Sequence, residues 1–109
     1  MSVNNTNEID AIGLDKNTND VYLTVKDDID WTDEVYHINK LQEKLNTYLR
    51  FIESGEVYDV YPEAKGKNFV IEILSKFNFP ESGKDFLSKA GSVISKAGFK
   101  LIHEVFPGK

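Results

Sequence analysis

Two histidines and the carboxylates near them are the first residues that could do chemistry. Asp33 precedes His37 by four positions, so on a helix the two side chains would lie one turn apart and could form an acid–imidazole pair. Such a pair predicts a small ligand-binding site or an enzyme that uses His37 and Asp33. His103 lies on the same face of a predicted strand as Leu101 and Val105, which favours a partly buried structural histidine.

Other catalytic and cofactor-binding patterns are not found in the sequence. There is no cysteine, which excludes thiolate nucleophiles, disulfides and cysteine-based zinc or iron–sulfur sites. No nucleophile-elbow pattern is present, and the seven glycines occur singly rather than in a phosphate-binding loop. The sequence therefore predicts no cofactor, no metal and no enzymatic activity, with the His37 and Asp33 pair as the alternative.

The segment 15–20 opens like a calcium-binding loop, with Asp15, Asn17 and Asn19 at alternate positions. The next position of such a loop needs glycine and is Asp20 here, and the twelfth needs a bidentate glutamate and is Lys26. Asn and Asp also favour tight turns, because their side chains bond to the nearby backbone. The segment therefore predicts a hairpin turn rather than a calcium site.

An acidic run precedes and enters the first predicted helix, and it consists of Asp27, Asp28, Asp30, Asp33 and Glu34. Carboxylates at a helix N-terminus cap free N–H groups and meet the positive end of the helix dipole. That role explains part of the run. The alternative is a surface that binds a basic partner, for which the four aspartates are the candidate residues.

Trp31, Tyr58 and Tyr61 lie in predicted loops. Large amphipathic rings often anchor protein interfaces, which makes the three residues candidates for partner binding. They can equally hold a loop against the domain that carries them.

The charge balance argues against nucleic-acid binding. Aspartate and glutamate outnumber lysine and arginine by 18 to 13, the formal net charge is −5, and Arg50 is the only arginine. Nucleic-acid surfaces need clustered basic residues, so the composition fits a basic protein partner better. No segment approaches the roughly 18 consecutive apolar residues of a membrane span.

Residues 1–7 are polar and rich in asparagine, so we expect a disordered tail without signal-peptide features. The remaining chain, 8–109, has the length of one domain with a single hydrophobic core. The absence of cysteine favours a reducing, cytoplasmic compartment.

Hydrophobic periodicity predicts two helices among four strands. The strands are expected at 9–14, 21–26, 69–77 and 99–106, by their alternation of apolar and polar residues. The first helix is expected from a cap at Asp30 to Glu53, with Gly55 after its end, and the second opens with a capping box of Ser82 and Asp85. The apolar stripe of the first helix comprises Val35, Ile38, Leu41, Leu45, Tyr48, Leu49 and Ile52, with Lys40, Glu43, Lys44 and Asn46 opposite.

This order, ββαβαβ, predicts an α+β fold: a two-layer sandwich in which two helices cover one face of a four-stranded mixed sheet. The second face of the sheet would then carry Tyr22, Thr24, Val70, Glu72, Leu74, Ile102, Glu104 and Phe106. That set is too apolar to be fully solvated. Either the aromatic connection 56–67 covers this face, or another molecule does.

The run from Leu41 to Gly55, followed by Tyr58, Tyr61-Pro62 and Lys65-Gly66-Lys67, resembles a family of short bacterial proteins that carry a domain of unknown function. The resemblance covers most of the chain. It implies a bacterial, single-domain, cytoplasmic protein, and it implies no catalytic residues.

Taken together, these features predict a non-catalytic protein-binding module of a regulatory or immunity type. The candidate contacts are the acidic and aromatic residues named above, together with Tyr22, Leu74 and Phe106 of the second sheet face. A structural homodimer joined through that open face is the alternative.

Overall fold

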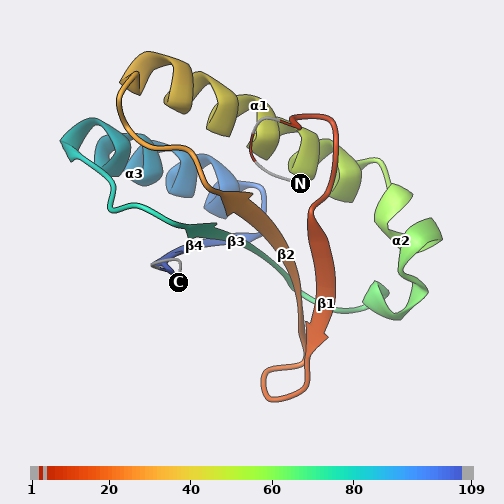
Figure 1. The fold of residues 1–109 in the computed structure, drawn as a ribbon. Helices are drawn as coiled ribbons and strands as arrows, with labels where there is room; N and C mark the ends of the chain where they lie inside the picture. Colours follow the sequence, from red (N-terminus) through yellow and green to blue (C-terminus); the bar gives the residue numbers. More distant parts are fainter. Residues whose placement is uncertain (1–2, 4, 107–109) are drawn as a thin grey trace.

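Strands and helices follow one another in the predicted order, with one short helix added (Figure 1). The structure is a computed structural model that describes Val3 and residues 5–106. The helices are α1 (Glu34–Glu53), α2 (Glu56–Val60) and α3 (Glu81–Lys96), and a 3-10 turn, η1, spans Pro62–Ala64. The strands are β1 (Ala11–Asp15), β2 (Asp20–Asp27), β3 (Phe69–Ser75) and β4 (Lys100–Val105).

The sheet is mixed, and its strands lie in the order β1-β2-β3-β4. β1 and β2 form an antiparallel hairpin, whereas β2, β3 and β4 run parallel. Helices α1 and α3 make the two crossovers and lie on one face of the sheet (Figure 1). The predicted α+β class and the mixed four-stranded sheet are confirmed.

The turn between β1 and β2 is built from the Asn and Asp residues that resemble a calcium loop. Asp15 Oδ1 accepts a hydrogen bond from the Asn17 amide, and Thr18 Oγ1 accepts one from the Asp20 amide. Asn19 has a left-handed backbone with φ of 65°, a conformation that asparagine tolerates well. The side chains are therefore used in the turn, as predicted.

β3 is a central strand with buried residues on both faces. Phe69, Ile71 and Ile73 point into the core beneath the helices, while Val70 is buried on the opposite face. This pattern is typical of a central strand, and β3 has β2 along one edge and β4 along the other. β3 ends at Ser75, two residues earlier than predicted.

α1 buries one face against the sheet, although its composition differs from the prediction. The buried residues are His37, Leu41, Lys44, Leu45, Tyr48, Phe51 and Ile52. Val35, predicted in the apolar stripe, is 71% exposed in the first turn. Lys44, predicted on the polar side, is fully buried because three oxygen acceptors surround its ammonium group.

The cap of α1 is Asp33 and not Asp30. Asp33 Oδ1 accepts a hydrogen bond from the Tyr36 amide, and its own backbone is extended. Asp30 instead closes a turn by accepting a hydrogen bond from the Thr32 amide. At the other end Gly55 has φ of 86°, so the predicted left-handed residue after the helix is confirmed.

The predicted capping box of α3 is wrong. The helix begins at Glu81 after Pro80, so Ser82 already lies inside the first turn and cannot cap it. Its hydroxyl donates instead to Glu34 in the first turn of α1, which joins the starts of the two helices.

The connection after α1 folds into α2 and η1 rather than an irregular loop. Tyr58 contacts the ring of Phe69 edge-on, and Tyr58 and Tyr61 both lie against the core. Phe69 points to the helix side of the sheet, so the connection packs on that side. It leaves the second face of the sheet uncovered.

Candidate functional site

The described helices leave the second face of the sheet open (Figure 1). Strand register places the predicted residues on it in rows, together with Lys26 and Lys100: Tyr22, Val70 and Lys100; then Thr24, Glu72 and Ile102; then Lys26, Leu74 and Glu104. Phe106 follows β4 and is 67% exposed. We call this set of residues, with Phe106, the open face.

Apolar and charged groups alternate across the open face. Val70 is buried there between Tyr22 and Lys100 although it is not part of the main core. Burial raises the pKa of the Glu72 carboxyl, a hydrogen bond from Thr24 opposes this shift, and the charge of Glu104 adds to it. A donor or cation supplied from outside would therefore stabilise the Glu72 carboxylate.

On the helix side, a buried polar cluster lies where the parallel strands end. Asp27 ends β2 and Ser75 ends β3, so both lie at the carboxyl edge of the sheet, where open α/β sheets commonly bind ligands. His37 Nε2 lies 2.7 Å from Asp27 Oδ2, and both side chains are fully buried. We call Asp27 and His37 the histidine pair.

The imidazole of His37 faces an acceptor at each nitrogen. Its Nδ1 lies 3.0 Å from the carbonyl oxygen of Asp30, which can only accept, so Nδ1 carries a hydrogen. The Asp27 carboxylate also accepts from the Ile29 amide at 3.2 Å. The pair thereby ties the end of β2 and the following loop to the first turns of α1.

Aromatic rings cover the histidine pair. Trp31 stacks on His37 with ring centroids 3.8 Å apart, and Phe79 meets the edge of Trp31 at 4.7 Å. Gly83 lies under both rings, where a Cβ atom would stand 2.9 Å from each. The rings occupy the carboxyl edge of the sheet, so His37 and Asp27 have no path to a substrate in this conformation.

A second histidine lies on the other side of Phe79. His103 Nε2 is 2.7 Å from Ser75 Oγ, and the His103 ring centroid is 4.2 Å from that of Phe79. Burial lowers the pKa of His103, while the charges of Asp27 and Glu104 oppose that shift. A neutral imidazole that accepts a hydrogen bond from the Ser75 hydroxyl fits this setting.

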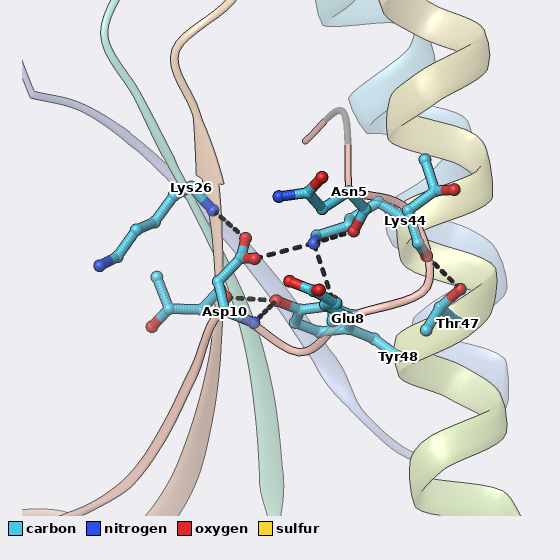
Figure 2. A network of polar contacts seen from close by, with 9 residues as sticks. Asn5, Glu8, Asp10, Lys26, Lys44, Thr47 and Tyr48 are labelled. Carbon is cyan, nitrogen blue, oxygen red and sulfur yellow. Dashed lines mark hydrogen bonds and ion pairs between the residues drawn. The ribbon is translucent and has the colours of Figure 1, made fainter. Parts of the chain in front are cut away.

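Lys44 forms a separate buried network with the N-terminal segment (Figure 2). Its Nζ donates to Asp10 Oδ1 at 2.8 Å and to the carbonyl oxygens of Asn5 and Glu8 at 2.6 and 2.7 Å. The nearby Thr47 hydroxyl donates to the Thr6 carbonyl oxygen. We call Asp10 and Lys44 the lysine pair.

Tyr48 and Asp10 bond to the edge of β2 just before β1 begins (Figure 2). The Tyr48 hydroxyl accepts from the Asp10 amide at 2.8 Å and donates to the Thr24 carbonyl oxygen at 2.5 Å. Asp10 Oδ2 accepts from the Lys26 amide at 2.9 Å. Burial is the main reason that the pKa of Tyr48 is raised, which keeps the hydroxyl protonated.

Within residues 1–7, for which the sequence predicts a disordered tail, several described groups contact the rest of the domain. Val3 is fully buried in the core, and the carbonyl groups of Asn5 and Thr6 are bonded to α1. Polar composition suggested disorder, but the backbone carbonyls satisfy Lys44 regardless of side-chain type.

The predicted acidic surface is smaller in the structure than in the sequence. Asp27 is withdrawn into the core by His37, while Asp28 is exposed. Asp30 and Asp33 are exposed but accept local hydrogen bonds from the turn and helix start. Those bonds from Thr32 lower the pKa of Asp30. The predicted pairing of His37 with Asp33 is wrong, because Asp27 occupies that position.

A family model decides where the chain belongs, since it matches residues 1–107 of 109. The chain belongs to a family of unknown function, DUF6572. A search of curated proteins and a search of solved structures each gave no match. The resemblance to a domain of unknown function is therefore confirmed.

The described residues show neither a cluster of metal ligands nor a membrane-spanning helix. Among the residues that the structure describes, no three His, Asp or Glu side chains converge as metal ligands would. None of the described helices combines the length and the apolar character needed to cross a bilayer.

Sequence reasoning missed both buried pairs, although a signal for them exists. His37 and Lys44 lie four residues before and three after Leu41, so all three share the stripe that α1 presents to the sheet. A histidine and a lysine inside an apolar stripe indicate buried partners. The identity of those partners, Asp27 and Asp10, depends on the fold.

Proposed function

We propose that this protein is a non-catalytic binding module, and that the open face is the surface that contacts its protein partner. The observation that carries the proposal is the open face itself: Tyr22, Leu74, Ile102 and Phe106 are only partly buried or exposed, and no described helix lies over them. A face of this kind gains stability when a second surface removes it from water.

The charges of the open face favour a partner with basic groups set among apolar ones. Glu72 lies at the centre of the face and Glu104 lies beside it, and partial burial disfavours the charged form of Glu72. A lysine or arginine placed over this position would offset that cost, while apolar groups covered Leu74 and Phe106.

The burial of His37 supports a non-catalytic role. His37, the candidate catalytic residue of the sequence, is fully buried under Trp31, and Asp33 caps α1 instead of contacting it. Tyr58 and Tyr61 hold the connection to the core of their own domain. The chemistry that remains accessible is surface recognition.

The test is a substitution on the open face with a matched control elsewhere. Leu74→Glu places a charge at the middle of the face, and Val93→Glu makes the same change on α3, where Val93 is 60% exposed. Proteins captured from the native host by the wild type and by Val93→Glu should be lost with Leu74→Glu, and the Kd of a purified partner should rise by about tenfold or more.

The homodimer is distinguished in the same experiment by measuring mass in solution. A dimer that becomes monomeric with Leu74→Glu would identify the partner as a second copy. A strictly monomeric wild type whose captured proteins are unaffected by Leu74→Glu would refute the proposal.

A further inference from the structure

The outer edge of β1 carries free backbone hydrogen-bonding groups. The Val21 amide bonds to Asn68 beside β3, so the odd residues of β2 face β3 and the even residues face β1. By the register, Ala11 and Gly13 then bond to β2, while the N–H and C=O groups of Ile12 and Leu14 point away from the sheet. No described residue bonds to these four outward groups.

β1 is short, with five residues, but it lacks several other features that protect an edge strand. Its pairing with β2 is continuous from Ala11 to Asp15, without a bulge, and it contains neither proline nor lysine. The opposite edge strand, β4, begins with Lys100 and contains His103 and Glu104. β1 is therefore the edge that an added strand could join.

A groove of about 690 Å³ lies beside the start of β1, on the helix side of the sheet, where Ala11 and Ile12 line it. Ile9, Ile12 and Phe51 give it apolar walls, and Val60 of α2, which is 60% exposed, closes its outer side. Its volume lies within the range of about 300–1,000 Å³ typical of ligand sites.

Arg50 is the one cationic residue among those that line the groove, which Asp10 and Glu56 also line. The guanidinium is exposed, and its only described polar contact is Thr47 Oγ1 at 3.3 Å; no described carboxylate lies within ion-pair distance of it. Glu56 also lines the groove but does not pair with Arg50. The one arginine of the chain is thus available to a carboxylate from outside.

We propose that the β1 edge and this groove bind an extended, acidic segment of another polypeptide, which adds to the sheet as a fifth strand. The outward groups of Ile12 and Leu14 supply the backbone bonds, alternate side chains enter the groove, and a carboxylate pairs with Arg50. This site is separate from the open face, and it does not depend on the function proposed for that face.

A single strand fits the groove better than a second copy of the domain does. α2 stands beside β1 and forms the outer wall through Glu56 and Val60 (Figure 1). An isolated extended segment needs room for one strand only beside this wall, whereas a second copy would also have to place its own helices there.

The test uses synthetic seven-residue peptides of alternating threonine and valine, with glutamate, glutamine or lysine at the central valine position. Binding is followed by the amide signals of the ¹⁵N-labelled protein. The glutamate peptide should shift the signals of residues 11–15, and it should bind about fivefold more tightly than the lysine peptide, as one partly exposed ion pair gives.

Backbone methylation of the glutamate peptide distinguishes strand addition from side-chain binding. Methylating alternate amides on one edge should abolish binding, while methylating those on the other edge should leave it unchanged, because only one edge faces β1. Equal binding by both methylated peptides would overturn the proposal.

Arg50→Gln should remove the preference for glutamate, and Glu56→Gln should increase it. Lys96→Gln is the matched control, since Lys96 is also a cation in the last turn of a helix and lies outside the groove. Shifts on the open face, no binding of any peptide at about 1 mM, or dimerisation through β1 would each refute the proposal.

Discussion

His37 and Lys44 leave the same face of α1 two turns apart, and each is buried completely beside an aspartate from the sheet side of the molecule. The histidine pair fixes the end of β2 and the loop that leads into α1. The lysine pair fixes residues 5–10 and the start of β1. One helix face therefore holds two irregular segments in place through buried polar side chains.

The two pairs differ in how well they can tolerate change. An ammonium group has three donors and no acceptor, and Lys44 uses them on Asp10 and two carbonyl oxygens. An imidazole nitrogen can donate or accept, so the histidine pair can exchange its hydrogen-bond direction. We therefore expect the lysine pair to be the more sensitive of the two.

Lys44→Met should have the largest effect. It leaves the buried Asp10 carboxylate without its cation and two carbonyl oxygens without donors, and we expect a loss of about 3–5 kcal/mol in the free energy of unfolding. Denaturant unfolding measures the loss. Hydrogen exchange should show reduced protection at the Asp10 and Lys26 amides, which depend on this network.

Lys40→Met is the control for that variant. Lys40 lies one turn earlier on α1, is partly exposed and stands 4.0 Å from Glu43. Its replacement should change stability by no more than about 0.5 kcal/mol. If both variants lose the same stability, the buried network is not what stabilises the N-terminal segment.

Gly83→Ala tests the aromatic cover that only the histidine pair has. A Cβ atom at this position would stand 2.9 Å from Trp31 and from Phe79, so the stacked rings must shift. The overpacking should cost about 1–3 kcal/mol and exceed the helix-propensity gain of alanine, about 1 kcal/mol. Unfolding and the fluorescence of Trp31, the only tryptophan, report the change.

Gly91→Ala is the matched variant in the same helix. No atom lies within 4 Å of the Cβ that it would add, so only the propensity gain should appear and stability should rise. A loss of stability in Gly91→Ala would mean that helix position, rather than the rings near Gly83, decides the sign.

Asp27→Asn should be milder than the loss of Lys44. The asparagine oxygen can accept from the Ile29 amide while its amide donates to Nε2 of a neutral His37, so both hydrogen bonds persist. We expect a loss near 1 kcal/mol. Asp10→Asn should cost more, because Asp10 must accept from both Lys44 and Lys26 and the Lys44 charge loses its partner.

The difference between the pairs also explains what the sequence could predict. Alternation of apolar residues and the Asn and Asp of the hairpin turn act between neighbours, so the strands, their faces and the turn were predictable from short segments. The open face likewise follows from alternation. These features do not depend on knowing which distant segments meet.

The buried pairs depend on contacts between distant segments. Lys44 and Asp10 are 34 positions apart in the sequence. Helical spacing predicted Asp33 as the partner of His37, whereas the fold places Asp27 beside it. The ends of elements were mispredicted for a similar reason. Asp10 and Tyr48 bond to the edge of β2 in place of strand residues, so β1 begins at Ala11, two residues after its predicted start.

The smallest expected effect concerns pH and the second histidine beside the cluster. Burial lowers the pKa of His103 below its ordinary value, about 6.5, so the unfolded chain takes up a proton at a higher pH than the folded one. The stability that this provides is complete above the unfolded pKa and is lost as pH decreases through it toward the folded value. The ring is partly exposed, which should keep the loss below about 1 kcal/mol.

His103→Gln should remove that part of the pH dependence. Unfolding midpoints of the wild type and the variant, compared between pH 7.5 and 5.5, should converge as the pH decreases, because the variant lacks the imidazole that takes up a proton on unfolding. Parallel profiles would show that His103 does not contribute to the pH dependence of stability. Because Ser75 and the ring of His103 are hydrogen-bonded, a Ser75→Ala variant should shift the pH at which stability is lost while leaving the lysine pair unaffected.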